Sequence, residues 1–189
     1  MHLITDLEAT CWEVPKVPDL NEIIDIGIVV CNDLYEIVDT WESLVRPTIN
    51  PKLSPFCKKL TAITQDQIDK ADTLDLVFKN FSQWFMMKFN LDHQVISWHT
   101  WGTWDLKCLK NDCIRNLIQF PFGEHVDLKE KYTKKRSLTS GKNGLQTALE
   151  QEKFEPSTHT HRGLSDALGA AKIAKLLFDQ ENTETIIIY

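Results

Sequence analysis

The sequence has no long apolar run and no apolar leader at its start. No apolar stretch among its 189 residues approaches the ~20 residues that a membrane-spanning helix needs. Asp6 and Glu8 interrupt the first residues with charge, so we expect no signal peptide. We therefore expect a cytoplasmic protein with no membrane partner, and the nucleus is the alternative if the source is eukaryotic.

Paired cysteine motifs are absent as well. The five cysteines are odd in number and scattered, and the closest two, Cys108 and Cys113, are not spaced as a CxxC pair. This spacing argues against a zinc site or a dithiol redox centre. We interpret the cysteines as buried or incidental free thiols.

Internal repeats and low-complexity segments are also missing. Hydrophobic residues make up 42% of the chain and charged residues 25%, which are ordinary values for a globular protein. A disordered or fibrous protein is therefore excluded. The length fits one domain of ~100–200 residues, so we predict a single domain over residues 1–189.

The chain has fewer basic than acidic residues, and its formal net charge is −6. Proteins that bind nucleic acid usually carry the opposite sign. Carboxylates that hold cations would, however, be neutralised in the working protein. The segment Lys129–Lys142 also has six basic residues against Glu130 alone. It is either a solvated lysine-rich loop or a contact for a nucleic-acid backbone, and the sequence leaves both readings open.

Hydrophobic patterning predicts an α/β fold with helices on both faces of a sheet. The predicted strands are His2–Thr10, Ile23–Cys31, Leu34–Val45 and Val95–Ser97, with a turn at Cys31–Asp33. The predicted helices are Pro55–Leu60, Thr64–Lys70 with Thr64 as N-cap, one from about Thr73, one from Asp105 to Cys113, Leu145–Leu149 and Leu164–Phe178. Phenylalanines between Phe78 and Phe89 recur at helical spacing and are assigned to the core. The tail Thr185–Tyr189 is left unassigned.

The first chemical feature is the triplet Asp6-Leu7-Glu8. In a strand, residues two apart point to the same face, so both carboxylates project together. Two adjacent carboxylates repel each other unless a cation lies between them, and hard divalent cations prefer oxygen ligands. Alone, such a triplet is also typical of a solvated strand face.

Two further acidic positions occur at predicted helix starts. Asp105 follows a strand and opens a helix, a junction that faces the carboxyl edge of an α/β sheet. It could equally stabilise the helix N-terminus electrostatically. His161 precedes a helix whose first turns contain Asp166. Histidine suits a general base because its ordinary pKa is ~6.5.

In combination these elements resemble the DEDDh exonucleases of the ribonuclease H-like (DnaQ-like) superfamily. The matching motifs are DLEATC at Asp6–Cys11, WGTWD at Trp101–Asp105 and His161-x4-Asp166. The resemblance extends over essentially the whole chain and is strongest to the histone-mRNA 3′-end and RNAi-enhancing exonucleases and their bacterial relatives. Further matching stretches are NEIIDIGIVV at Asn21–Val30, Val45-Arg46-Pro47 and Pro55–Ala71. The resemblance implies a mixed central β-sheet flanked by α-helices.

The chain departs from its relatives at three positions. Ala62 and Gly169 stand where relatives commonly have glycine and asparagine, and Ser165 stands where many carry another acid. The five motif residues are all present, which argues against an inactive copy.

The resemblance also implies a chemistry. Asp6, Glu8 and Asp166 would hold a Mg²⁺ or Mn²⁺ ion, with Asp6 approaching a second ion and Asp105 acting through coordinated water. His161 would deprotonate the water that attacks the last phosphodiester and releases a nucleoside 5′-monophosphate. His159 is a second histidine nearby, but the x4 spacing favours His161.

Substrate contacts are expected around the motifs. Trp104 is a candidate platform for the terminal base, with the protein core as its alternative place. Leu7 and Trp12 could wedge the last nucleotides, and the main chain at Ala9 and Thr10 would lie near the terminal sugar. His99 is expected to be structural or exposed.

The sequence thus predicts a 3′→5′ exonuclease for single-stranded 3′ ends, with RNA favoured over DNA by the resemblance alone. The alternatives are a 3′→5′ DNA exonuclease and a non-catalytic nucleic-acid-binding protein on the same fold. No appended RNA-binding domain is apparent, so a protein partner could supply targeting.

Overall fold

The computed structural model describes residues 1–14, 20–138, 143–155 and 161–186, with side chains as far as Asp179. Its strands are β1 (His2–Ala9), β2 (Ile23–Cys31), β3 (Ile37–Leu44), β4 (Ser97–Thr100) and β5 (His125–Asp127). Its helices are α1 (Pro55–Thr61), α2 (Gln65–Lys70), α3 (Leu74–Phe89), the 3₁₀ helix η1 (His93–Val95), α4 (Trp104–Arg115), α5 (Leu128–Lys135), α6 (Leu145–Gln151) and α7 (Gly163–Ile186). No helix in the described ranges is long and apolar enough to cross a membrane.

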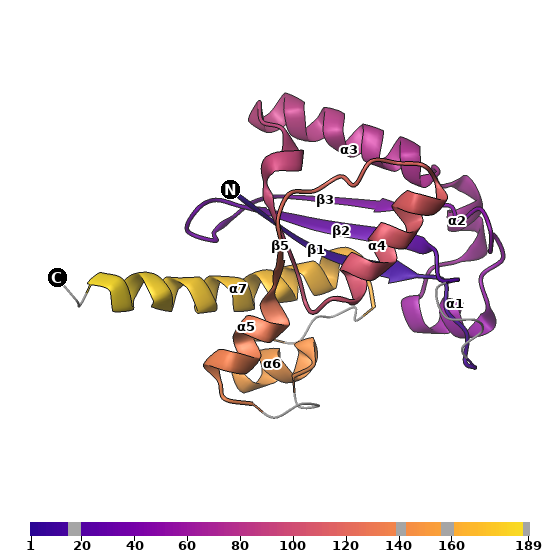
Figure 1. The fold of residues 1–189 in the computed structure, drawn as a ribbon. Coiled ribbons are helices and arrows are strands. Elements are labelled where there is room, and N and C mark those ends of the chain that lie inside the picture. Colours follow the sequence, from indigo (N-terminus) through magenta and orange to yellow (C-terminus); the bar gives the residue numbers. More distant parts are fainter. Residues whose placement is uncertain (15–19, 139–142, 156–160, 187–189) are drawn as a thin grey trace.

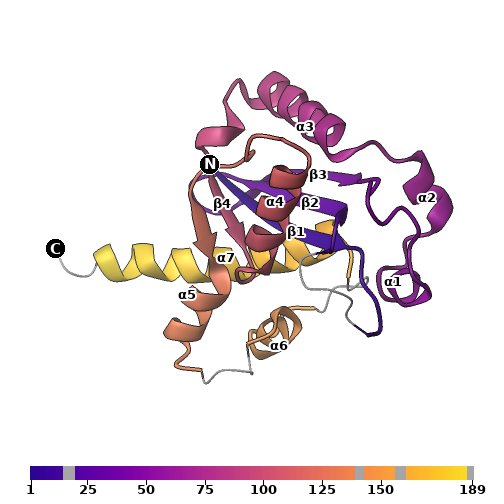
Figure 2. The ribbon, with the colours of Figure 1, turned by 45° about the vertical axis from the view of Figure 1, so that its right-hand side comes forward.

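The five strands form one mixed sheet in the order β3-β2-β1-β4-β5. The pairs β1–β2 and β2–β3 are antiparallel, whereas β1–β4 and β4–β5 are parallel. Helices α3 and α4 lie on one side of the sheet and α5, α6 and α7 on the other, while α1 and α2 lie beyond its end (Figures 1 and 2). The predicted fold class is therefore confirmed.

Alternation along β1 and β2 explains the two layers of the core. Every residue of β2 is buried, because both faces of this strand are covered. On one face Leu3, Ile26 and Ile28 pack against the phenylalanines of α3, which confirms their predicted place in the core. On the other face Ile4 and Val29 pack against α5, α6 and α7.

Side-chain caps fix where the two short helices begin. Ser54 accepts a hydrogen bond from the backbone of Cys57 at the start of α1. Thr64 and Gln67 form a reciprocal capping box at the start of α2, which confirms the predicted N-cap. Ala62, at the commonly glycine position, ends α1 with a φ of 58° and thus adopts the left-handed conformation that glycine would adopt more easily.

Two predicted strands have different bounds in the structure. Residues 93–95 form η1, because the Asp92 side chain caps a short turn, and β4 runs through Ser97–Thr100 instead of Val95–Ser97. The strand predicted from Leu34 begins only at Ile37. Asn32 extends the turn by accepting hydrogen bonds from two following backbone groups, and Tyr35 has a φ of 55° there.

The segment after residue 124 differs most from the prediction. β5 and α5 were not predicted, because a three-residue strand and a lysine-rich helix carry little apolar periodicity. The first part of the basic segment is thus a helix, and residues 139–142 lie outside the described part of the chain. Helix α7 continues beyond Phe178 to Ile186 and includes the start of the unassigned tail.

Candidate active site

The acid pair lies at the carboxyl end of β1. Asp6 and Glu8 alternate with buried Leu7 and share one face of the strand, as predicted. Asp105 reaches this face from the first turn of α4, and its Oδ1 atom accepts a hydrogen bond from the backbone nitrogen of Leu7 at 3.1 Å. That bond fixes the third carboxylate beside the first two.

Two glycines let the start of α7 approach β1 and β2 closely. Gly27 lies opposite Asp6 on β2, and a Cβ atom at Gly27 would lie 2.0 Å from the backbone nitrogen of Leu164. A Cβ atom at Gly163 would lie 2.9 Å from the carbonyl oxygen of Asp6. Side chains at these positions would push the helix away, so the glycines bring the start of α7 against the acid pair.

His161 and Asp166 complete the cluster from the start of α7. The backbone nitrogen of His161 donates to Asp166 Oδ2 at 2.9 Å, which holds the aspartate toward the preceding segment. His161 has a φ of 63°, a left-handed conformation that is uncommon for a non-glycine residue. Its side chain is exposed, whereas Asp166 is buried. His159 lies outside the described residues.

An ion pair that the sequence did not suggest anchors this segment. Asp25 lies opposite Glu8 on β2 and is buried. Its Oδ2 atom accepts hydrogen bonds from Arg162 Nε at 2.8 Å and from the backbone nitrogen of Gly163 at 3.2 Å. Arg162 follows His161 directly, so the pair fixes the backbone that carries the histidine.

These residues line one cleft of about 620 Å³. Its lining consists of Asp6, Leu7, Glu8, Trp101, Trp104, Asp105, Gly144, Leu145, Gln146, Thr147, His161 and Asp166. All five motif residues are therefore brought together. Trp104 is 50% exposed, so half of its surface remains open to a ligand rather than lying in the core. Trp101 instead donates from its indole nitrogen to the carbonyl oxygen of Asn143.

Gln146 is a cleft residue that the sequence did not suggest. It lies on α6, and its Nε2 atom donates to Asp166 Oδ1 at 3.2 Å. Together with His161, it satisfies both oxygens of Asp166. No motif marks this glutamine, because its place depends on how α6 packs against α7.

Burial disturbs the acidity of the four carboxyl groups. Burial, and after it the charges of neighbouring acids, raises the pKa of Glu8 to about 8 and that of Asp6 well above its usual range. Burial raises the pKa of Asp105 to about 7 and also raises the pKa of Asp166. Acids gathered in this way repel one another when ionised, and such perturbed groups are typical of functional sites.

The donor set fits a divalent cation. Glu8, His161 and Asp166 each place one ligand atom within 4.8 Å of the others'. Carboxylate oxygens are the ligands that Mg²⁺ and Mn²⁺ prefer, and a cation would relieve the repulsion among the acids. The residues present therefore suit a cation of this class.

Three predicted substrate contacts lie outside the lining of the cleft. Ala9 and Thr10 are buried, and Trp12 is half-buried. The backbone nitrogen of Thr10 donates to the carbonyl oxygen of Glu22 at 2.8 Å, while its hydroxyl accepts from the Glu22 nitrogen at 2.9 Å. These groups of Thr10 hold the start of β2 in place. The substrate roles of Ala9, Thr10 and Trp12 stay predictions.

The basic residues in and just after α5 contact the helix itself and other parts of the chain. Lys134 pairs with Glu130, and Lys135 donates to the carbonyl oxygen of Leu177 at 3.0 Å. Lys131 lies 5.3 Å from the centre of the Phe178 ring. Arg136 forms two hydrogen bonds with Glu152 just after the helix. These contacts favour a structural role for this part of the segment over a role in binding a nucleic-acid backbone.

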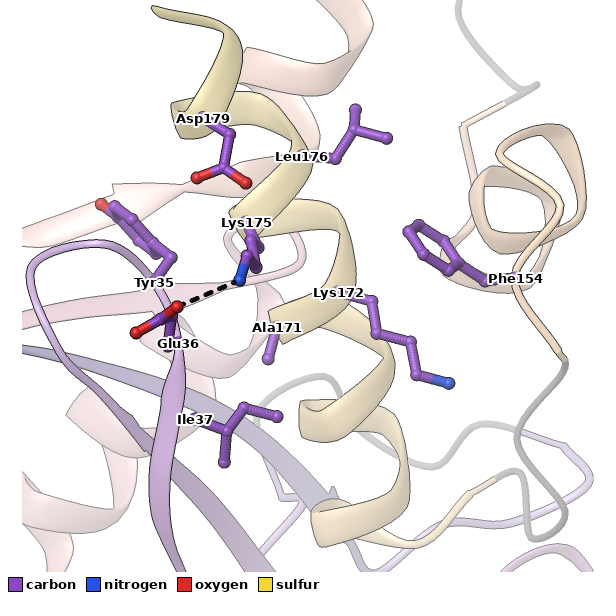
Figure 3. Close-up of a pocket in the computed structure, with 9 residues that line it drawn as sticks. All are labelled: Tyr35, Glu36, Ile37, Phe154, Ala171, Lys172, Lys175, Leu176 and Asp179. Carbon is purple, nitrogen blue, oxygen red and sulfur yellow. Dashed lines mark ion pairs between the residues drawn. The ribbon is translucent and has the colours of Figure 1, made fainter. Parts of the chain in front are cut away.

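A second hollow of about 620 Å³ lies away from the acid cluster (Figure 3). Leu176 and Lys172 of α7 lie on the side toward Phe154, and Tyr35 and Ile37 flank the helix on the other side. The charges there are partly balanced, because Lys175 pairs with Glu36 at 3.6 Å. The five motif residues all lie elsewhere.

His99 was expected to be either structural or exposed. It is buried and contacts the Tyr35 hydroxyl at 3.2 Å, so it is structural.

Comparison with known proteins gives these residues a context. The model of the Exonuclease family (RNase_T) matches residues 3–174. Human 3′-5′ exoribonuclease 1 is 35% identical over 175 residues, covering 90% of this chain and 50% of the relative. The probable 3′-5′ exonuclease KapD of Bacillus subtilis is 39% identical over 183 residues, covering 93% of this chain and 83% of the relative. The chain thus spans about half the length of the human relative.

A solved structure agrees with the sequence comparisons. The nuclease domain of 3′hExo, described as a DEDDh family member bound to rAMP, superposes with a TM-score of 0.84 and 33% identity. The match covers 94% of this chain and 91% of that domain. The chain belongs to the Exonuclease family, and it has the ribonuclease H-like fold of that DEDDh member.

Proposed function

We propose that the protein is a metal-dependent 3′→5′ exonuclease that trims single-stranded ends, with RNA as the favoured polymer. The observation that carries the proposal is the gathering of Asp6, Glu8, Asp105 and Asp166 with an exposed histidine in one cleft. The family match and the activities of the relatives support it. Both curated relatives named above are described as 3′-5′ nucleases, and one as an exoribonuclease.

Each residue has a task in this reaction. Two cations bound by the acids would stabilise the attacking and leaving oxygens of the phosphodiester. Asp6, Glu8 and Asp166 would hold them, and Asp105 would act through bound water. The exposed ring of His161 is free to accept a proton from the attacking water, because the hydrogen bond to Asp166 uses only its backbone nitrogen. The product would be a nucleoside 5′-monophosphate.

Trp104 supports the preference for single strands. Its half-exposed ring borders the acid cluster on the first turn of α4. Stacking of an unpaired base on an aromatic ring contributes ~1–3 kcal/mol and tolerates every base. A paired terminal base would be less available for this contact. We therefore expect paired 3′ ends to be degraded more slowly than single-stranded ones.

The test is digestion of RNA and DNA oligonucleotides of matched sequence and length, each labelled at the 5′ end. With Mg²⁺ or Mn²⁺ we expect a ladder that shortens from the 3′ end, faster for RNA, and no ladder with EDTA. Asp6→Asn should abolish it. Asp66→Asn, which alters an exposed surface ion pair on α2, is the matched control and should leave it unchanged.

Other outcomes would favour the alternatives. Faster digestion of the DNA strand would replace the RNA preference with a DNA exonuclease. Binding of the oligonucleotide without any shortening, with or without metal, would favour a non-catalytic binding protein. Digestion that Asp6→Asn leaves unchanged would refute the two-cation site.

A further inference from the structure

Two cysteines meet at the junction between the acid-bearing strand and α1. Cys11 is half-buried and lies two residues beyond the end of β1. Cys57 is fully buried in the first half of α1, within a small apolar cluster. Cys11 packs against the same cluster from outside. Cys11 and Cys57 are 46 positions apart in the sequence, yet they meet at this junction.

The hydroxyl of Ser54 joins the backbones of the two cysteines. Its Oγ atom donates to the carbonyl oxygen of Cys11 at 2.6 Å and accepts from the backbone nitrogen of Cys57 at 2.9 Å. The Cys57 sulfur lies 3.8 Å from the carbonyl oxygen of Ala9, so it is directed toward the end of β1. One bridging oxygen thus holds the backbone of Cys11 beside that of Cys57. A disulfide between them requires a Cα separation of ~4.4–6.8 Å.

The acidity of the two thiols favours their reaction with an oxidant. A hydrogen bond from the Cys11 thiol lowers the pKa of Cys57 to about 7, while the same contact raises the pKa of Cys11. The pair therefore has thiolate character near neutral pH, and the thiolate is the reactive form of cysteine. In contrast, burial raises the pKa of Cys31 to about 11 and that of Cys113 to about 12.

We propose that Cys11 and Cys57 form a reversible intrachain disulfide when the protein meets a peroxide. The Cys57 thiolate takes the proton of the hydrogen-bonded Cys11 thiol, and the half-buried Cys11 sulfur then attacks a peroxide oxygen. The O–O bond breaks, giving a Cys11 sulfenic acid and a hydroxide that takes the proton back from Cys57 to form one water. The Cys57 sulfur then attacks the Cys11 sulfur, so the S–S bond forms, the S–O bond breaks and a second water leaves. Two thiols and one hydrogen peroxide thus become one disulfide and two waters. A dithiol reductant reverses the bond.

The bond would tie α1 to the end of the strand that carries Asp6 and Glu8. It would also close the loop between residues 11 and 57, which restricts the unfolded chain. We therefore expect the Tm to rise by about 5–10 °C on oxidation and to fall back with dithiothreitol. This proposal needs no nuclease activity, so it can fail or succeed independently of the proposed function.

The test is brief exposure of the full chain to a small excess of hydrogen peroxide, followed by alkylation in denaturant and peptide mapping. We expect two of the five thiols to escape alkylation and a Cys11–Cys57 cross-linked peptide that dithiothreitol abolishes. Cys11→Ala and Cys57→Ala should each abolish both the cross-link and the rise in Tm. Cys113→Ala should retain both.

Cys11→Ala changes a half-buried side chain, so it tests the pair even if Cys57→Ala fails to fold. Alkylation of all five thiols after peroxide treatment would overturn the proposal. So would a cross-link that joins other cysteines, or peroxide treatment that only adds oxygen to Cys11 without linking it to Cys57.

Discussion

At the scale of single residues, the proposed function depends most on how the backbone and the ring of His161 are used. Its backbone nitrogen orients Asp166, whereas its exposed ring faces the cleft. Arg162 and Asp25 fix the next peptide, so the backbone that carries the exposed ring is anchored. Exposure to solvent suits a general base, because the base must accept a proton from water and then release it.

Replacement of this ring tests its role as the base. His161→Ala should lower kcat by ~10²–10⁴-fold, because only the proton-accepting group is lost. The backbone bond to Asp166 remains, so the Tm should stay within a few degrees of wild type. The measurement is single-turnover digestion of a labelled RNA at saturating Mn²⁺. A rate within threefold of wild type would remove His161 from the mechanism.

Gln146 should act on metal affinity rather than directly on chemistry. Removing a group that orients a metal-binding carboxylate commonly weakens metal affinity ~10–100-fold. Gln146→Ala should therefore raise the Mn²⁺ concentration needed for half-maximal activity by that factor, with a smaller loss at saturating metal. Gln94→Ala, at an exposed position on η1, is the control. Equal loss of rate at every Mn²⁺ concentration would contradict this positioning role.

At the scale of elements, the contact between α7 and β2 determines whether the site assembles. Gly27→Ala places a methyl group where the backbone of α7 now lies, only 2.0 Å from the Leu164 nitrogen. We expect a loss of ~1–3 kcal/mol in unfolding free energy and at least a ~10²-fold loss of activity, since small displacements of catalytic groups are costly. Urea unfolding and the RNA assay measure the two effects.

A stability-matched control separates misplacement from instability. Ile28→Val, on the same strand, removes one buried methylene and should cost ~0.5–1.5 kcal/mol without moving α7. It should keep near wild-type activity in the folded state. Equal activity of the Gly27 and Ile28 variants would show that the close approach of α7 is not needed for catalysis.

The strongly patterned elements could be predicted from sequence, and the packing-dependent ones could not. Asp6 and Glu8 share a face because a strand alternates, and Asp105 follows from its place at a helix start. The side-chain contact of Gln146 with Asp166 depends on tertiary packing between α6 and α7 that no local pattern encodes. Asp25 was missed because it reads as one polar residue in an apolar strand. The hydrogen bonds between Thr10 and the backbone of Glu22 likewise depend on tertiary packing.

At the scale of the whole molecule, we expect the acid cluster to couple stability to pH and to metal binding. In the folded protein the pKa of Glu8 is raised to about 8, above its usual value of ~4.3. The stability that this group contributes without metal is therefore fully present below about pH 4 and is lost as the pH rises through about 8. Cations should restore it, because they bind the ionised form of the cluster.

The Tm gain on adding Mn²⁺ should consequently be larger at about pH 8 than at about pH 6, where protons compete with the metal. At ~100 times the dissociation constant the gain in unfolding free energy should reach ~2.7 kcal/mol. Glu8→Gln should reduce both the gain and its pH dependence. A Tm that Mn²⁺ leaves unchanged at both pH values would contradict the coupling.

A count of bound Mn²⁺ decides whether the cleft holds two catalytic cations. Equilibrium dialysis of the folded protein against Mn²⁺, without substrate and then with a non-hydrolysable RNA 3′ end, gives the stoichiometry. We expect two ions per chain in the presence of the RNA analogue and fewer than one in Asp6→Asn under the same conditions. Binding of no more than one ion by the wild type, or equal binding by Asp6→Asn, would contradict it.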